Sequence, residues 1–192
     1  MRIIGGYAAG LQLKSPPDGV KPTMDRVREA VFSSLEPIEG LCIVDLFAGS
    51  GALGFEAFSR AAGQVAWFEQ DPARVKALKE NLEKLKDFID DEDHGEHKVF
   101  CGDILSAAKI LSHWKPDIIL ADPPYNPLDH EKGSYELLQN SEFQDWAKDA
   151  LVVMEQSKHN PLDPSCLDYW DIIRHKKYGN QLVYYFRLKS DG

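Results

Sequence analysis

The hydrophobic positions of this chain form short apolar runs that alternate with stretches of helical spacing. Five runs predict strands, the first and fourth continuous enough for a buried parallel sheet, and they cover residues 41–47, 65–69, 98–101, 117–121 and 151–155. Apolar residues between these runs recur at the spacing of one helix face, and the predicted helices cover residues 54–60, 72–88, 105–113 and 135–150. This alternation predicts an α/β domain built around a mostly parallel sheet.

The two ends of the chain follow other patterns. Residues 157–165 contain two prolines and predict a loop, whereas residues 169–174 and 181–188 alternate in polarity around Lys177-Tyr178-Gly179-Asn180 and predict an antiparallel hairpin. At the start, residues 2–13 predict a small hairpin, and Thr23 predicts the N-cap of an amphipathic helix, with Val27, Ala30, Val31, Ser34 and Leu35 on one face. We therefore expect a seven-stranded sheet in residues 39–192 behind an N-terminal extension of residues 1–38.

Length and composition fit a single compact domain. The chain has 192 residues, 43% of them hydrophobic. Cys42, Cys101 and Cys166 lie too far apart in sequence to suggest metal ligands or a disulfide framework, so we expect no metal. The first residues lack the apolar core of a signal peptide, and no apolar run approaches the ~20 residues of a membrane span. We expect a monomeric, cytoplasmic protein with no membrane contact.

The charge balance is acidic, with 22 Lys and Arg against 31 Asp and Glu and a formal net charge of −9. Such a balance is unusual for a protein that binds nucleic acid by itself. The distribution changes this picture, because residues 87–96 carry six acidic side chains and no Lys or Arg. The first 35 residues instead hold five basic side chains against three acidic ones, and the basic residues are Arg2, Lys14, Lys21, Arg26 and Arg28.

A glycine-rich turn follows the first predicted strand, in Asp45-Leu46-Phe47-Ala48-Gly49-Ser50-Gly51-Ala52-Leu53-Gly54. Glycines let the backbone pass close to a ligand, and the free N–H groups of the next helix face that ligand. The turn therefore predicts a nucleotide site. Its glycines also satisfy the dinucleotide pattern G-x-G-x-x-G, so NAD is a competing cofactor.

Acidic residues at three successive strand ends favour S-adenosylmethionine over NAD. Asp45 can engage the methionine ammonium and would repel a pyrophosphate, Glu69 can accept from the ribose hydroxyls in either cofactor, and Asp103 can accept from the adenine amino group. Strand-end acids also cap helices, which we favour for Asp71 and leave open for Asp103. The expected cofactor-binding residues are Asp45, Phe47, Ala48, Gly49, Ser50, Gly51, Glu69, Gln70, Asp103, Ile104 and Asp122.

The fourth predicted strand leads into Asp122-Pro123-Pro124-Tyr125, which predicts an amine-binding catalytic site. Prolines carry no N–H donor, and their fixed φ leaves the preceding carbonyls pointing outward. The amino group of a base is a poor nucleophile, so its site must accept hydrogen bonds from both N–H groups. The Asp122 carboxylate and the Pro123 carbonyl can do so, Pro124 stiffens the motif, and Tyr125 offers a ring for stacking on the base. The alternative is a structural strand end in which Asp122 caps a neighbour and Tyr125 fills a gap.

With these motifs the chain resembles, over nearly its whole length, the bacterial 16S ribosomal RNA guanine-N2 methyltransferases of the small-subunit methyltransferase D type. Arg2-Ile3-Ile4-Gly5-Gly6 and the block from Lys21 to Phe32 are similar to that family's opening and its Arg-Pro-Thr-x-Asp-Arg-Val-Arg-Glu block. The resemblance implies a Rossmann-like class I methyltransferase fold and RNA binding by the N-terminal extension through Arg2, Lys14, Lys21, Arg26 and Arg28. Because these few basic residues offer few phosphate contacts, we expect modest affinity for naked 16S RNA and favour a partly or fully assembled small subunit as the partner.

The chain departs from the family's pattern at two places, and several alternative functions remain. The chain lacks the arginine that the family often has before its Lys-Leu, and residues 90–93 form an acidic insertion. A DNA adenine-N6 or cytosine-N4 methyltransferase shares the order of the motifs, and a protein-glutamine methyltransferase has Asn where this chain has Asp122. An NAD-dependent oxidoreductase and an inactive RNA-binding module are the rivals from other classes.

Overall fold

The computed structural model describes residues 1–15, 25–89, 95–124, 132–162 and 167–189. They form a seven-stranded sheet in the order β3-β2-β1-β4-β5-β7-β6. The strands are β1 (Cys42–Leu46), β2 (Gln64–Glu69), β3 (Glu96–Cys101), β4 (Ile118–Ala121), β5 (Leu151–Ser157), β6 (Trp170–Tyr178) and β7 (Gln181–Leu188). The first five run parallel, while β7 is antiparallel to β5 and to β6. The predicted mostly parallel sheet with a C-terminal antiparallel hairpin is confirmed.

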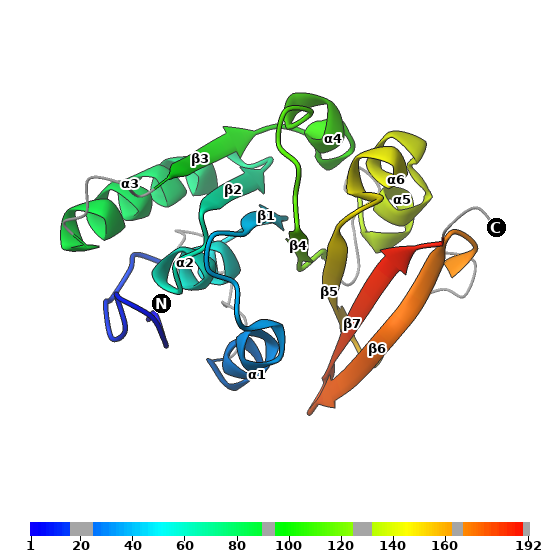
Figure 1. The fold of residues 1–192 in the computed structure, drawn as a ribbon, viewed down its shortest axis with the longest axis horizontal. Helices are drawn as coiled ribbons and strands as arrows, with labels where there is room; N and C mark the ends of the chain where they lie inside the picture. The colour runs from blue at the N-terminus through cyan, green and yellow to red at the C-terminus, as the bar shows by residue number, and fades with distance from the viewer. Residues whose placement is uncertain (16–24, 90–94, 125–131, 163–166, 190–192) are drawn as a thin grey trace.

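Helices cover both faces of the sheet (Figure 1). One layer consists of α1 (Asp25–Leu35), α2 (Ala52–Ser59) and α3 (Pro72–Ile89), and the other of the 3-10 helix η1 (Ile104–Ser106), α4 (Ala107–Ile110), α5 (Ser134–Gln139) and α6 (Ser141–Ala147). Alternate residues of each parallel strand enter two separate apolar clusters, as Ile43 and Val44 of β1 show. In the described part of the chain, no helix combines the length and apolarity that a membrane crossing requires.

Two predicted helices were wrong in their extent. Residues 135–150 form two helices, because the backbone of Asn140 is extended and its side chain accepts a hydrogen bond from Phe143 N at 2.8 Å as the N-cap of α6. Residues 105–113 reduce to η1 and the four-residue α4. The expected cap Thr23 lies outside the described residues.

The first 15 residues fold back onto the domain. They form the small antiparallel hairpin predicted for residues 2–13, with a bridge between Arg2 and Gln12 and backbone hydrogen bonds from Leu13 N to Met1 O at 2.8 Å and from Ile3 N to Leu11 O at 3.1 Å. Ile3, Ala8 and Leu13 are buried in the same apolar cluster as α1, α2 and α3. The N-terminal extension therefore shares the core of the α/β domain.

A buried carboxylate ties this extension to the domain. Glu56 of α2 is fully buried and accepts hydrogen bonds from Ile4 N at 2.9 Å and Gly5 N at 2.7 Å. It also pairs with the Arg28 guanidinium of α1 at 3.5 Å and with Arg60 at 2.9 Å. One side chain thus joins three segments that are distant in sequence.

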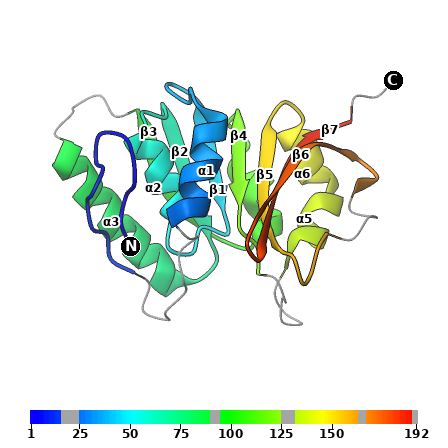
Figure 2. The same cartoon turned by 90° about the horizontal axis from the view of Figure 1, so that it is seen from below.

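At the other end of the sheet, β6 and β7 form a long hairpin with β6 as the edge strand (Figure 2). The pairing of β6 with β7 shifts register between Ile172 and Arg174, which marks a β-bulge. Ile172 and Ile173 are exposed beside this bulge. The hairpin packs against α1 through a 2.8 Å hydrogen bond between Ser34 and Tyr185.

Candidate active site at the carboxyl edge of the sheet

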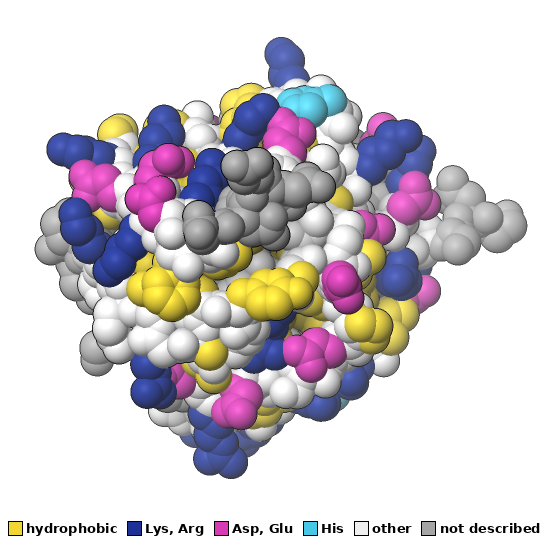
Figure 3. Space-filling view, turned by 60° about the vertical axis from the view of Figure 1, so that its left-hand side comes forward, with side chains coloured by type: hydrophobic (Ala, Val, Ile, Leu, Met, Phe, Trp, Pro, Cys, Tyr) yellow, Lys and Arg dark blue, Asp and Glu magenta, His cyan; other side chains and the backbone are white. Residues whose placement is uncertain are grey.

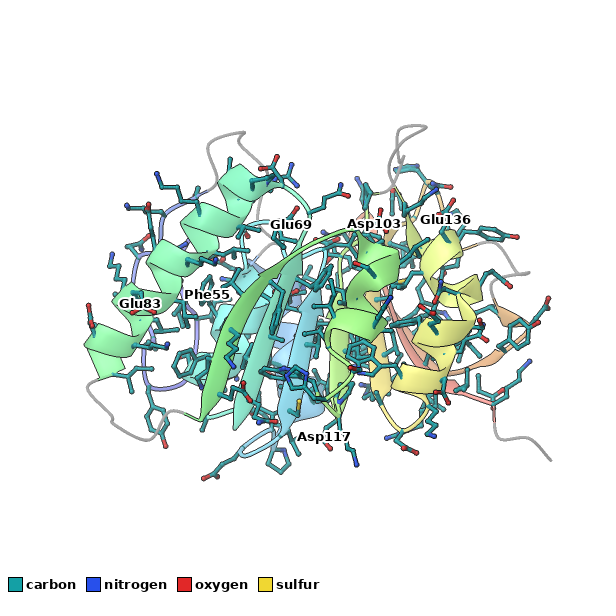
Figure 4. All side chains as sticks on the ribbon, turned by 90° about the horizontal axis from the view of Figure 1, so that it is seen from above. Phe55, Glu69, Glu83, Asp103, Asp117 and Glu136 are labelled. Carbon is teal, nitrogen blue, oxygen red and sulfur yellow. The ribbon has the colours of Figure 1, made fainter. Side chains whose placement is uncertain are left out.

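The acidic residues singled out from the sequence meet at one edge of the sheet. Asp45 lies near the end of β1, Glu69 ends β2, Asp103 follows β3, and Asp122 follows β4. Figure 4 shows Glu69 and Asp103 along this edge, with Asp117 at the opposite edge. Ligands of open α/β sheets bind outside the carboxyl ends of the strands, so this edge is the candidate active site.

The glycine turn between β1 and α2 has an unusual backbone. Phe47, Gly49 and Gly51 all have positive φ, at 56°, 52° and 75°. A bulky residue such as Phe47 rarely adopts this conformation, and such strain gathers at ligand sites. Gly49 N donates to Glu69 Oε2 at 2.8 Å, so the turn is fixed against the end of β2.

Space requires two glycines of this segment, Gly51 and Gly54, and Gly51 also has a positive φ. A Cβ on Gly51 would lie 2.4 Å from Leu78, and a Cβ on Gly54 would lie 2.2 Å from Trp67 Nε1. Gly54 therefore lets α2 pack directly on β2, the role of the third glycine in nucleotide-binding turns.

Asp45 lies in a buried, negatively charged part of the candidate site. Its carboxylate is buried and accepts from Gly54 N at 2.9 Å. Burial raises the pKa of Asp45 well above its ordinary range, and the nearby Asp122 and Glu69 carboxylates raise it further. A cation placed among these three carboxylates would relieve their repulsion. S-adenosylmethionine carries a sulfonium and an ammonium and fits this site, whereas a pyrophosphate would add to the repulsion.

The other acidic residues at the strand ends accept hydrogen bonds from backbone N–H groups. Asp71 accepts from Ala73 N at 2.7 Å and Arg74 N at 3.1 Å, which confirms it as the cap of α3. Asp103 is exposed and accepts from Leu105 N at 2.9 Å, so the capping role left open from the sequence is present. Glu69 accepts from Asp71 N at 2.9 Å as well as from the glycine turn.

The remaining expected contacts differ in exposure. Ala48, Ser50 and Ile104 are buried, Phe47 and Asp122 are half-buried, and Gln70 is exposed. In the predicted catalytic motif Pro123 is buried and Pro124 is half-buried, while Tyr125 lies outside the described residues.

The expected RNA-binding residues separate into different environments. Arg2, Lys14 and Arg26 are exposed, and Lys21 lies outside the described residues. Arg28 was expected at the surface and is instead fully buried. It donates to Arg2 O at 2.6 Å, lies 3.0 Å from Asp25 and pairs with Glu56, so it serves the fold and we remove it from the RNA-binding set.

A glycine turn follows β1, and an Asp-Pro-Pro motif follows its neighbour β4 at the same edge of the sheet. This combination defines the chain as a methyltransferase of the Rossmann-like class I fold. The family described as Conserved hypothetical protein 95 matches residues 1–187. Ribosomal RNA small subunit methyltransferase D of Escherichia coli K12 is 35% identical over 199 residues, which cover 100% of this chain and 92% of the relative. The chain therefore belongs to the ribosomal RNA small subunit methyltransferase D family.

A second relative and a solved structure agree. Ribosomal RNA small subunit methyltransferase D of Haemophilus influenzae is 33% identical, covering 93% of this chain and 89% of the relative. The structure of the putative methyltransferase yhhF from Escherichia coli matches with 29% identity and a TM-score of 0.70, covering 100% of this chain and 99% of that one. Membership of this family confirms the fold class, and it supports S-adenosylmethionine over NAD as the cofactor.

We predict that S-adenosylmethionine raises the melting temperature of the protein and that NAD does not, because only the first places positive charge among the site carboxylates. Glu69→Gln should weaken the affinity by roughly 10- to 100-fold, since a hydrogen bond to an ionised acceptor contributes about 1.5–3 kcal/mol. Thermal shift and calorimetry measure both. A shift produced by NAD alone would refute the cofactor assignment.

Proposed function

We propose that this protein transfers the methyl group of S-adenosylmethionine to the exocyclic N2 amine of a guanine in 16S ribosomal RNA. One observation carries the proposal: the Asp122-Pro123-Pro124 motif follows β4 beside the cofactor turn that follows β1, in a chain of this family. The two strands are hydrogen-bonded neighbours, so the amine and the methyl donor would be held side by side.

The chain's own groups would act by accepting hydrogen bonds and by positioning. The Asp122 carboxylate and the Pro123 carbonyl would hold the two N–H groups and orient the nitrogen lone pair as the nitrogen becomes pyramidal. When bound, S-adenosylmethionine supplies an electrophilic methyl group on its sulfonium. Asp45 and Glu69 would hold the charged and ribose parts of the cofactor. No covalent bond to the protein forms in this scheme.

Methylation of an amine in DNA is the nearest rival and is less well supported. Proteins that read DNA bases place a recognition element in the major groove, usually from a separate domain. In the described part of the chain, the N-terminal loop shares its core with the sheet and the C-terminal hairpin is part of the sheet. The relatives named for ribosomal RNA also favour RNA.

We further propose that Arg2, Lys14 and Arg26 face the RNA and that the substrate is a partly or fully assembled small subunit. Arg2 and Lys14 already pair with Asp25 at 3.3 Å and with Glu80 at 2.7 Å. Exposed pairs of this kind contribute little and can be exchanged for phosphate contacts. These few cations of the N-terminal segment would by themselves give modest affinity for naked RNA, and proteins of the particle would add to the docking site.

The test is incubation with labelled S-adenosylmethionine and small subunits from cells that lack the modification, followed by nucleoside analysis of the RNA. We expect label in N2-methylguanosine, with particles labelled faster than naked 16S RNA. Label in N6-methyladenosine or N4-methylcytidine, or label in DNA alone, would contradict the proposed base.

A further inference from the structure

The C-terminal hairpin carries a concentration of positive charge that the catalytic motifs do not explain. Residues 172–189 contain five Lys and Arg side chains and no Asp or Glu, in a chain whose net charge is −9. The first 35 residues hold the same number of basic side chains together with three acidic ones. The local electrostatic potential, more than the net charge, decides where a phosphate backbone binds. The hairpin is therefore a stronger candidate than the first 35 residues for the surface that binds RNA phosphates.

The strand register places these charges level with the catalytic motif. Neighbouring strands pair in one row through Ala121, Met154, Tyr184 and His175. The next row contains Glu155, Val183 and Lys176, and Asp122 directly follows Ala121. Three strand spacings of about 4.8 Å separate the ends of this row, so the backbones of Asp122 and Lys176 lie about 14 Å apart along the sheet.

The hairpin also extends past the catalytic edge. Strand β4 ends at Ala121, whereas β5 continues three residues beyond the paired Met154 to Ser157. At about 3.3 Å per residue this adds about 10 Å. Lys158 N donates to Asn180 O at 2.8 Å, so the chain after β5 lies against the hairpin turn. The basic end of the hairpin therefore projects beyond the edge of the sheet, beside the candidate active site.

We define the hairpin tip as Lys158, Arg174, Lys176 and Lys177. Lys176 is half-buried and the other three are exposed, and none of the four forms an ion pair with another described residue. The Arg174 guanidinium lies 4.1 Å from the centre of the Tyr185 ring, a cation–π contact that positions it. These cations are free to neutralise phosphates.

The N-terminal side of the molecule differs. On the face that Figure 3 shows, Lys and Arg side chains are interspersed with Asp and Glu. On the N-terminal loop and α3, Lys14 pairs with Glu80 and Lys86 pairs with Glu83. A surface of mixed sign attracts a polyanion less than one of uniform sign.

We infer that the hairpin tip is the principal phosphate-binding surface for the RNA segment that flanks the target base. This inference rests on the proposed function and specifies how its substrate is held. Phosphates one to a few nucleotides from the target would lie over Arg174, Lys176 and Lys177, while the target base reaches Asp122.

The test compares two triple variants that remove the same charge. Lys158→Ala, Lys176→Ala, Lys177→Ala alters the hairpin tip, and Lys79→Ala, Lys109→Ala, Lys115→Ala removes three exposed lysines elsewhere. Binding of unmodified small subunits is measured over a range of salt concentrations. Each lost phosphate contact should reduce the slope of log affinity against log salt by about 0.7, so the hairpin variant should lose about 2 units of slope and roughly tenfold or more in affinity.

Melting temperature and S-adenosylmethionine affinity, which should match the wild type in both variants, show that the fold is intact. A slope that falls equally in both variants, or in neither, with an active wild-type enzyme, would overturn the hairpin inference and leave the proposed function standing. Failure of the wild type to methylate ribosomal RNA would overturn both. A loss confined to the hairpin variant, together with label in N2-methylguanosine, supports both.

Discussion

Replacing Asp122 by alanine should slow methyl transfer by about a hundredfold while leaving S-adenosylmethionine affinity within a few-fold of wild type. Asp122 would supply one of two acceptors for the amine as it becomes pyramidal in the transition state. Loss of one such acceptor costs on the order of 3 kcal/mol of activation free energy. Since Asp122 is only half-buried and follows the strand, its removal should not unfold the site.

Single-turnover rates with saturating cofactor and small subunits measure this effect, and calorimetry measures cofactor affinity. Asp145→Ala is the matched control, because Asp145 is exposed on α6 and pairs only weakly, at 3.7 Å, with Lys148. A near-wild-type rate for Asp122→Ala would remove this carboxylate from the mechanism. An equal loss in both variants would assign the effect to something other than amine binding.

Replacing Glu56 by alanine should lower the free energy of unfolding by about 3–5 kcal/mol, the cost of leaving a buried charge without its partner. Arg28 is fully buried, and burial lowers the pKa of its guanidinium while Glu56 and Asp25 raise it. Without Glu56, the N–H groups of Ile4 and Gly5 also lose their acceptor. The N-terminal loop should detach along with the loss of stability.

Urea denaturation of Glu56→Ala and of the control Glu83→Ala tests this expectation. Glu83 pairs with Lys86 at 3.5 Å, its side chain is 71% exposed, and its removal should change the free energy of unfolding by less than about 1 kcal/mol. The double variant Glu56→Ala, Arg28→Met should recover part of the loss, because it removes the unpaired charge. No recovery would show that the backbone hydrogen bonds, and not the ion pair, carry the stability.

The candidate active-site edge of the sheet could be predicted from sequence because parallel strands bring their carboxyl ends together. Once residues 41–47, 65–69 and 117–121 were identified as strands, Asp45, Glu69 and Asp122 had to converge. These strands could be identified because a strand that is buried on both faces consists of consecutive apolar residues.

Other features depend on tertiary contacts that leave little trace in the sequence. Arg28 looks like a surface residue on an amphipathic helix, and only the position of Glu56, 28 residues further on, explains its burial. Asn140 interrupts a helical pattern by capping the next turn, which competes with the apolar spacing around it. The position of Lys176 beside Asp122 along the strand direction depends on the pairing register of four neighbouring strands. The sequence alone does not determine that register.

The bulge in β6 has a consequence for how the molecule behaves at high concentration. An exposed edge strand with Ile172 and Ile173 at its surface offers unpaired backbone groups to a second sheet, the usual start of aggregation. The register shift bends that edge, and Arg174 and Lys177 place charge along it. Natural sheets use these same two devices to keep edges from joining. The cations that we assign to RNA thus also prevent the sheet from continuing from one molecule into the next.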